Sequence, residues 1–190
     1  MILGILKENS GDKRVSLLPE QAAVLVAKQV SVIVETGAGD AAYAADSTYT
    51  EKNVSVKDRS TVLSTADLVL SINPLSASEM SQLKPGAVVL GTFQPLFNTD
   101  LVKQAIDKKA SLFSMDMIPR TTRAQSMDVL SSQSNLAGYV AVIDAVYNLP
   151  KVVPMMMTAA GTVAAAKFMI LGAGVAGLQA IATAKRDRKS

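Results

Sequence analysis

The residues best suited to do chemistry lie in the segment KFMILGAGVAGLQAIATAKR, at positions 167–186. Phe168–Leu171 is a short apolar run of the kind that forms a buried parallel strand. Gly172, Gly174 and Gly177 follow as G-x-G-x-x-G, and apolar residues then recur at helical spacing. A strand, a glycine turn and a helix in this order bind the pyrophosphate of a dinucleotide on the free N–H groups that open the helix.

Each glycine has its own task in such a turn. Gly172 permits the tight bend, Gly174 lets the backbone approach the pyrophosphate, and Gly177 lets helix and strand pack closely. The expected contacts are the backbone N–H groups of Ala173, Gly174 and Val175, so the side chains at these positions matter less.

Two other interpretations of this segment stay open. Glycine-rich apolar turns also occur where nothing binds. Positions 163–184 are long and apolar enough to suggest a membrane span, but Lys167 and the glycines interrupt them, and a change from strand to helix explains them better. The acidic ribose contact expected about 20 residues after such a turn falls beyond Ser190.

A second segment with polar side chains, MIPRTTRAQSMDVLSSQS, covers positions 117–134. Composition alone favours a structural interpretation, in which Arg120 pairs with Asp128 in a loop and Ser131 bonds back within a helix. The alternative is that these polar groups contact a bound ligand.

Composition excludes several classes of site. The chain of 190 residues has no cysteine and no histidine, which rules out disulfides, thiolate metal sites, histidine bases and histidine-activated nucleophiles. The net charge of +3 arises from the basic positions 185–189, and only 4% of residues are aromatic, so nothing indicates a nucleic-acid surface. No signal peptide is expected, since Lys7 and Glu8 interrupt the first apolar run.

Apolar runs and helical patterns alternate along the chain. Strands are expected at positions 2–6, 30–34, 68–72, 87–90, 111–114 and 168–171. Helices are expected from Pro19, from Ser78 to Leu83 and from Thr99, with one or two short helices within 40–66. This alternation predicts an α/β fold with a mostly parallel sheet that has helices on both faces.

A long helix is expected from about Ser126 to just before Pro150. Gly138 inside it suggests close packing, because glycine costs a helix about 1 kcal/mol relative to alanine. The predicted organisation is a parallel-sheet domain over 1–125, a connecting helix over 126–149, and the first strand–turn–helix of a Rossmann domain over 150–190. Met155–Met157 is expected to fill a core.

Three stretches carry a resemblance to a known family: PRTTRAQSMDVLSSQSNLAGY, PMMMTAAGTV and GAGVAGLQAIATAKR. They resemble the NAD(H)-binding component, domain I of the alpha subunit, of proton-translocating NAD(P) transhydrogenase, which shares a superfamily with alanine dehydrogenase. The resemblance implies hydride transfer between NAD(H) here and NADP(H) on a partner component, coupled to proton movement through a membrane-spanning component.

The resemblance also implies an assembly and a location. The intact family member pairs as a homodimer, binds no metal and no nucleic acid, and carries no transmembrane segment in this component. It lies at the cytoplasmic face of the bacterial inner membrane or on the matrix side in mitochondria.

The resemblance assigns roles in the polar segment. Arg120, Gln125 and Asp128 match the loop that lies against bound NAD(H), Arg123 is a weaker match, and Ser131 matches the residue that helps to hold the carboxamide. No acid or base is implied, because hydride passes between cofactors and the protein supplies position and electrostatics.

A second activity of the superfamily, alanine dehydrogenase, is the alternative. Arg14 matches the arginine that binds the keto acid in those enzymes. Ser71 and Asn73 stand where their lysine is expected, however, and Phe93 and Gln94 stand in the region of their histidine. Arg14 is therefore expected to hold the loop before the first helix.

The sequence also departs from the transhydrogenase pattern. Ala164 and Ala165 replace two prolines before the nucleotide strand, and RDRKS at the end no longer follows the family. The chain is expected to be a truncated form that exposes apolar faces of its last strand and helix. A non-catalytic interaction module is therefore a further alternative.

Overall fold

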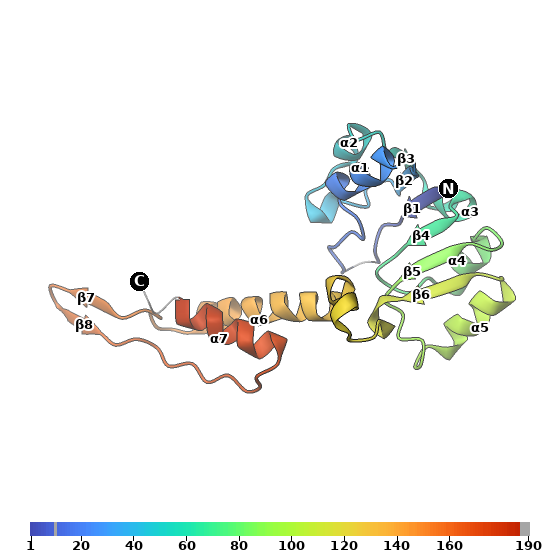
Figure 1. Cartoon of the computed structure of the whole chain (residues 1–190). Helices are drawn as coiled ribbons and strands as arrows, with labels where there is room; N and C mark the ends of the chain where they lie inside the picture. The colour runs from blue at the N-terminus through green and yellow to red at the C-terminus, as the bar shows by residue number, and fades with distance from the viewer. Residues whose placement is uncertain (10, 187–190) are drawn as a thin grey trace. The chain divides into compact units, whose positions relative to one another are not determined.

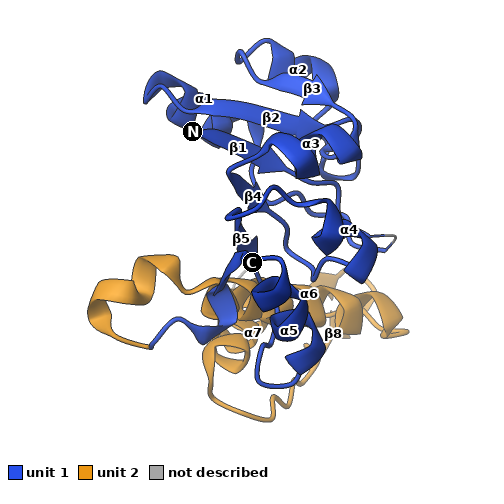
Figure 2. Cartoon of the chain, turned by 90° about the vertical axis from the view of Figure 1, so that its right-hand side faces the viewer, with its two compact units in different colours: residues 1–119 blue, residues 120–190 orange. Residues whose placement is uncertain are grey.

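The computed structural model describes residues 1–9 and 11–186 of the chain. These residues form two compact units, Met1–Pro119 (unit 1) and Arg120–Ser190 (unit 2), coloured separately in Figure 2. The basic positions 185–189, which give the chain its net charge, lie partly outside the described residues.

Unit 1 is built on a six-stranded parallel sheet in the order β3-β2-β1-β4-β5-β6 (Figure 1). In register, Leu3 of β1 stands between Val32 of β2 and Leu68 of β4. The strands are β1 (Ile2–Ile5), β2 (Ser31–Glu35), β3 (Ser55–Lys57), β4 (Leu68–Leu70), β5 (Val88–Gly91) and β6 (Ser111–Ser114). The strand order reverses between β1 and β4, and ligands of open α/β sheets bind at such a point, outside the carboxyl ends of the strands. The predicted α/β class with a parallel sheet is confirmed.

Helices cover both faces of this sheet, as expected for parallel strands (Figure 1). One core lies under α3, α4 and α5 and includes Val62, Met80 and Leu101; the other lies under α1 and α2 and includes Ala22 and Tyr49. The helices are α1 (Pro19–Ala27), η1 (Asp40–Ala42), α2 (Asp46–Thr50), α3 (Arg59–Thr65), α4 (Ala77–Gln82), α5 (Thr99–Asp107) and η2 (Met115–Met117).

Some local expectations for unit 1 need correction. The cap of α4 is Ser76, not Ser78, because the Ser76 hydroxyl and the Glu79 carboxylate bond reciprocally to each other's backbone N–H. The residue preceding α5 is Asn98, and Thr99 is already helical. The stretch from 40 to 66 contains the edge strand β3 in addition to its short helices. This strand pairs with β2 and is too short to show the alternation of apolar and polar residues that predicts a strand.

Unit 2 contains η3 (Thr122–Met127), α6 (Val129–Asn148), β7 (Met156–Thr158), β8 (Gly161–Val163) and α7 (Val175–Arg186). The long helix thus begins three residues after Ser126 and ends before Pro150, close to expectation. Strands β7 and β8 form an antiparallel hairpin that the sequence did not predict. Met155 precedes β7, and Met156 and Met157 belong to it. All three are exposed, so their expected core position is wrong.

The segment Phe168–Leu171 does not belong to a hydrogen-bonded ladder in the described part of the chain, so the strand expected here is not formed as such. A strand is defined by its neighbours, and a pattern of apolar residues does not supply them. The side chains nevertheless alternate as in a strand. Phe168 and Ile170 pack against the buried cluster of Val142, Ala180 and Ala184, whereas Met169 and Leu171 are 87% and 89% exposed.

Candidate functional site

The glycine turn has the geometry that a close approach of a ligand requires. Gly172 has φ 103°, a conformation that side chains rarely adopt. A Cβ added at Gly177 would lie 2.0 Å from the Gly172 carbonyl oxygen, whereas a Cβ at Gly174 would meet nothing within 4 Å. The first position is thus fixed by conformation, the third by packing, and the second faces open space.

Helix α7 presents free donors directly after this turn. Its first helical hydrogen bond runs from the Leu178 N–H to the Gly174 carbonyl at 2.9 Å. The N–H groups that precede Leu178 in the helix have no carbonyl of a preceding turn to bond. Ala173, Gly174 and Val175 are exposed, so these donors and the positive end of the helix dipole are accessible to an anion.

Helix α6 supports the turn from beside α7. A Cβ at Gly138 in α6 would lie 2.1 Å from the Ala176 carbonyl oxygen, one residue into α7. Val142 of α6 packs with Ala180 and Ala184 of α7 in a small buried cluster. The two helices run in the same direction, and α7 begins beside the middle of α6 (Figure 1). The sequence analysis did not identify Ala176 as the contact of α6. Gly138 inside α6 was the signal that could have indicated a close contact there.

The polar segment leads into the start of α6 through Asp128. The Asp128 carboxylate accepts hydrogen bonds from the Ser131 N–H at 3.0 Å and the Ser131 hydroxyl at 2.6 Å, which caps α6. These two bonds, helped by the positive charge of Arg120, lower the pKa of Asp128. Ser131 thus bonds to Asp128 and not to a helix carbonyl.

The remaining polar candidates precede α6. Arg120, Arg123 and Gln125 are exposed in and before η3, and Ala124 between them is buried. Within the described residues Arg120 forms no ion pair with Asp128. Asp128 precedes Gly138 by ten positions, so α6 separates the cap from the Gly138 contact by roughly 15 Å along its axis. A ligand that touches both the turn and the polar segment must span that distance.

A different polar cluster lies in unit 1, at the carboxyl ends of β1 and β4. The buried Glu8 carboxylate accepts the N–H of Ile72 at 2.6 Å, the N–H of Asn73 at 3.0 Å and the side-chain amide of Asn73 at 2.9 Å. Arg14 binds the Asp12 carboxylate through Nε at 2.9 Å and through a terminal nitrogen at 2.7 Å. The Arg14 guanidinium and the amide of Asn73 hold the pKa of Asp12 well below its usual range.

This cluster places the residues weighed for amine chemistry. The Ser71 hydroxyl donates to the Asn73 carbonyl at 2.8 Å, Phe93 is buried, and Gln94 takes a left-handed turn with φ 46°. None of these side chains has an acid–base role at neutral pH. Arg14 is held against the loop before α1 through Asp12, as expected.

The family follows from comparison with known proteins. Residues 4–137 match the model of the alanine dehydrogenase/PNT N-terminal domain, and residues 141–188 match that of the corresponding C-terminal domain. The chain belongs to the alanine dehydrogenase/PNT family. Both matched regions include part of α6, so the family's two domains meet within this helix.

Two relatives within the family are both the first part of an NAD(P) transhydrogenase alpha subunit. The protein from Rickettsia prowazekii is 43% identical over 190 residues, which covers 97% of this chain and 50% of the relative. The protein from Rhodospirillum rubrum is 45% identical over 193 residues, covering 98% of this chain and 50% of the relative. The chain therefore spans about half the length of the curated relatives that it matches.

Solved structures of the family agree with the fold. The transhydrogenase from Sinorhizobium meliloti superposes with a TM-score of 0.95 at 45% identity, over 99% of this chain and 57% of that one. An L-alanine dehydrogenase superposes with a TM-score of 0.84 at 22% identity, over 98% of this chain and 52% of that one, which supports the fold alone.

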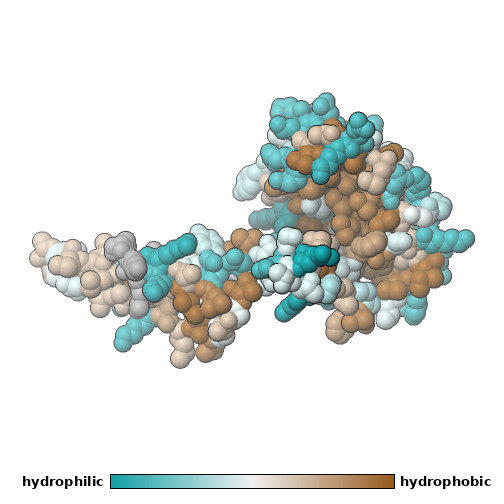
Figure 3. Space-filling view, viewed as in Figure 1, coloured by the Kyte–Doolittle hydropathy of each residue, from teal (hydrophilic) through white to brown (hydrophobic). Residues whose placement is uncertain are grey.

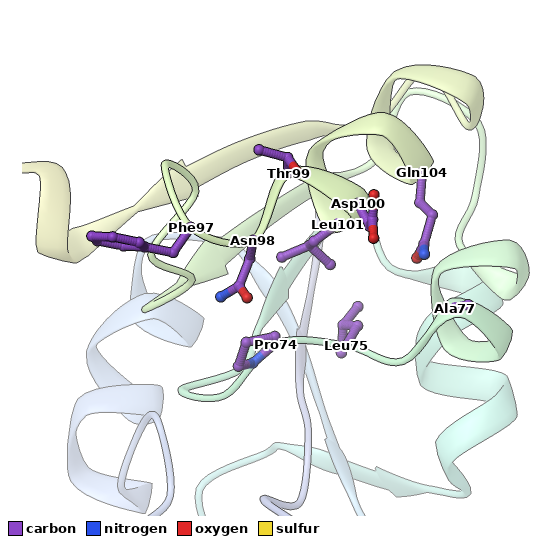
Figure 4. A pocket seen from close by; sticks show the side chains of 9 residues that line it. All are labelled: Pro74, Leu75, Ala77, Phe97, Asn98, Thr99, Asp100, Leu101 and Gln104. Atoms are coloured by element: carbon purple, nitrogen blue, oxygen red, sulfur yellow. The ribbon is translucent and has the colours of Figure 1, made fainter.

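Other features of this family member offer less to a dinucleotide. A cavity of about 220 Å³ in unit 1 is lined by apolar and neutral polar side chains and one carboxylate, and it has no cation for a pyrophosphate (Figure 4). Its lining residues are Pro74, Leu75, Ala77, Phe97, Asn98, Thr99, Asp100, Leu101 and Gln104.

Over the described positions there is no cluster of metal-ligating side chains. A search of the same positions finds no helix with both the length and the apolar character needed to cross a membrane.

Proposed function

We propose that this chain is the NAD(H)-binding part of a transhydrogenase, which transfers hydride between NAD(H) and NADP(H) on a partner component. Membrane-spanning partner components couple the transfer to proton translocation. The observation that carries the proposal is the turn at 172–177, where Gly174 leaves open space in front of the free N–H groups of α7. The names of the relatives at 43% and 45% identity support the same activity.

The residues fit a dinucleotide in charge and in space. The N–H groups of Ala173, Gly174 and Val175 hold the pyrophosphate, because they lie at the positive end of the α7 dipole. Gly172 and Gly177 shape the turn without touching the ligand. No side chain fills the space in front of Gly174, so a phosphate oxygen can approach the backbone.

The polar segment positions the nicotinamide. Asp128 accepts two bonds from Ser131, and an ionised carboxylate has about four acceptor sites, so it retains capacity for the N–H groups of a carboxamide. The Ser131 hydroxyl oxygen still has lone pairs to accept from the same amide. Arg120, Arg123 and Gln125 are exposed at this end of unit 2 and supply positive charge and hydrogen bonds to the second nucleotide or the phosphates.

The bound nicotinamide supplies the hydride chemistry. The contribution of the chain is to fix which face of the ring is presented and to hold the ring at a constant position. This division of labour explains how a site without histidine or cysteine can serve the reaction.

Calorimetry tests the assignment of residues. We join this chain to the second half of one of its transhydrogenase relatives and measure NADH binding with and without Arg120→Ala and Asp128→Asn. Both substitutions are expected to weaken binding at least tenfold, and hydride transfer to a purified NADP(H)-binding partner is expected to fall with them. Unchanged NADH binding in both variants would show that the polar segment is not the site.

The assembly proposed with this function follows the family. We place the protein on the membrane surface as a peripheral component, on the cytoplasmic side in bacteria or the matrix side in mitochondria, paired with a second copy. The exposed hairpin β7–β8, with Met156, Met157 and Val163 on its surface, is a suitable contact for that pairing. The proposal also keeps the division of the chain into a parallel-sheet domain (1–125), a connecting helix (126–149) and the start of a Rossmann domain (150–190).

Two alternatives have their own tests. The first alternative is a non-catalytic module, and micromolar binding of NADH by this chain alone would argue against it. Alanine dehydrogenase activity requires NADH oxidation that depends on pyruvate and ammonia in the joined protein. Asn73 at the position expected for lysine predicts that no such activity is found.

A further inference from the structure

Asp116 ties the end of β6 to the loop after β5. The Phe93 N–H donates to the Asp116 carboxylate at 3.1 Å and to the Ser114 hydroxyl oxygen at 2.9 Å. The Ser114 hydroxyl in turn donates to the same carboxylate oxygen. The pairing of β5 with β6 ends at Gly91 and Ser114, so Asp116 continues the connection beyond the sheet.

Phe93 is a firm point of attachment for that carboxylate. Its ring is 1% exposed and packs in the core that lies under α3, α4 and α5. Its carbonyl accepts the side-chain amide of Asn98 at 2.6 Å. Phe93 therefore moves only when this core opens, and a group bonded to its N–H is held to the core.

The Asp116 carboxylate is ionised and used for hydrogen bonds. Burial raises the pKa of Asp116, but the bonds from the Ser114 hydroxyl and from the N–H groups of Phe93 and Gln94 outweigh burial, so the pKa lies below its usual value. In the part of the chain that the structure describes, Asp116 forms no ion pair. An ionised acceptor makes a stronger hydrogen bond than a neutral one, which favours a tight attachment.

Beyond Asp116 the backbone has few bonds of its own. The Ile118 N–H bonds to the Met115 carbonyl at 3.4 Å, which is long for such a bond. Pro119 has no N–H to donate. No backbone hydrogen bond joins Pro119 or Arg120 to another described residue. The carboxylate of Asp116 is thus the last firm attachment before the polar candidates begin at Arg120.

Packing does little to hold the residues that follow. Arg120 and Arg123 are exposed, and Ala124 is the buried residue of η3. On the face seen in Figure 3, hydrophilic residues gather at η3, which is the gold coil of Figure 1. A segment with so little apolar surface gains little from burial, so its position depends on where the chain is attached.

We propose that Asp116 is a positioning residue for the polar segment, because its carboxylate fixes the point at which that segment leaves the core of unit 1. The inference rests on the proposed function and deepens it. Asp116 itself touches no cofactor and acts through Arg120, Gln125 and Asp128, which follow it in the chain. Pro119 has a fixed φ, so the link from Asp116 to Arg120 has few free rotations and transmits the attachment.

Limited digestion of the full chain with trypsin tests the attachment without NADH. Mass spectrometry measures the cleavage rates after Arg120 and Arg123, each divided by the rate after Lys52, an exposed residue of unit 1. Asp116→Ala is expected to raise this ratio about tenfold, because a released segment fits the protease more often. A general loss of stability in unit 1 would expose Lys52 as well and leave the ratio unchanged.

Two further variants serve as controls for this digestion. Asp116→Asn is expected to keep the parent ratio, because its amide oxygen can still accept from the Phe93 N–H and the Ser114 hydroxyl. Asp107→Ala removes an exposed carboxylate at the end of α5 and is expected to leave the ratio unchanged.

Hydride transfer measures the consequence for the site. In the chain joined to the second half of a relative and mixed with an NADP(H)-binding partner, Asp116→Ala is expected to lower kcat about tenfold. The KM for NADH is expected to rise less than about threefold, because every group that binds the cofactor is still present but the ring is held less constantly. Asp116→Asn is expected to restore kcat.

The outcomes separate the two proposals. A raised digestion ratio and a lowered kcat in Asp116→Ala, both restored in Asp116→Asn, support the positioning role. An unchanged ratio overturns it, as does an equal rise in Asp107→Ala or an unchanged kcat in an active joined protein. If the joined parent protein binds no NADH, the proposed function fails, and the digestion ratio alone decides whether Asp116 holds the segment.

Discussion

Gly138 of α6 lies directly against the Ala176 carbonyl of α7, so close that even a methyl group at Gly138 would come within 2.1 Å of the oxygen. Glycine is otherwise a poor choice inside a helix, where it costs about 1 kcal/mol relative to alanine. The close approach sets α6 beside the first turn of α7. The position of the candidate pyrophosphate donors is thus coupled to the helix that begins at the polar segment.

Gly138→Ala is expected to destabilise unit 2 despite the better helix propensity of alanine. Overpacking of a tight contact costs about 1–3 kcal/mol, which exceeds the gain of about 1 kcal/mol in propensity. Urea unfolding followed by circular dichroism measures the difference. Gly174→Ala is the matched control, because its Cβ meets nothing within 4 Å and should leave stability unchanged. Equal stability of Gly138→Ala and the parent would show that α6 and α7 separate easily.

Gly174→Ala and Gly177→Ala are expected to impair different properties, the first NADH binding and the second stability. In the chain joined to the second half of a relative, a methyl at Gly174 stands where the pyrophosphate approaches, so NADH binding weakens while the unfolding midpoint is kept. A methyl at Gly177 lies 2.0 Å from the Gly172 oxygen, so the turn itself is disrupted and stability falls. If Gly174→Ala binds NADH as tightly as the parent, the turn does not contact the dinucleotide.

Sequence patterns predicted the elements that are periodic and left out those that depend on contacts. The parallel sheet of unit 1 and the long helix over Val129–Asn148 follow from apolar spacing. The hairpin β7–β8 was missed because its residues are exposed on both strands and carry no period. The segment Phe168–Leu171 has the alternation of a strand, but pairing depends on neighbours that no local pattern supplies.

The same limit applies to the candidate site. The tasks of Gly172 and Gly177 could be inferred from spacing, since a bend and a close packing are local. The bonds between Asp128 and Ser131 were not foreseen, although an acidic residue three positions before a serine at the start of a helix is a capping signal. Composition favoured an ion pair between Arg120 and Asp128. In the structure the Asp128 carboxylate caps α6 instead.

Two substitutions, Asp128→Asn and Asp128→Ala, are expected to separate the structural role of Asp128 from its role in binding. Asparagine caps helices about as well as aspartate, so Asp128→Asn should retain the helical content of α6, whereas Asp128→Ala should lower it. If the carboxylate also holds the carboxamide of NADH, both variants of the joined protein lose affinity. Circular dichroism and calorimetry on the same samples distinguish these effects. Loss of affinity in Asp128→Ala alone would assign the residue to capping only.

Glu8→Gln is expected to destabilise unit 1 by about 1–3 kcal/mol. The carboxylate accepts the N–H groups of Ile72 and Asn73 and the Asn73 amide, and an amide NH₂ in place of one oxygen would face these donors without a partner. Chemical denaturation measures the cost. Glu51→Gln is the control, since Glu51 is exposed. Equal stability of the two variants would mean that the link from Glu8 to the loop after β4 contributes little.

Tyr49 is expected to give unit 1 a stability that declines in alkaline solution. The ring is fully buried and its hydroxyl donates to the Leu17 carbonyl at 2.7 Å. Burial, with smaller contributions from the charges of Glu20 and Asp46, raises the pKa of Tyr49 from its usual 10 to about 12. The unfolded chain therefore loses this proton first, so the free energy of unfolding is independent of Tyr49 below pH 10 and falls as pH rises from 10 to about 12.

Tyr49→Phe isolates the contribution of that hydroxyl. The variant should lose about 1 kcal/mol at neutral pH, because the Leu17 carbonyl loses its donor, and its stability should no longer fall through Tyr49 ionisation. The difference in tyrosinate absorbance between the parent protein and Tyr49→Phe follows the titration of Tyr49, which is expected near pH 12. A titration of Tyr49 near pH 10 in this difference would contradict the burial of the ring, because a buried phenol resists ionisation until the fold opens.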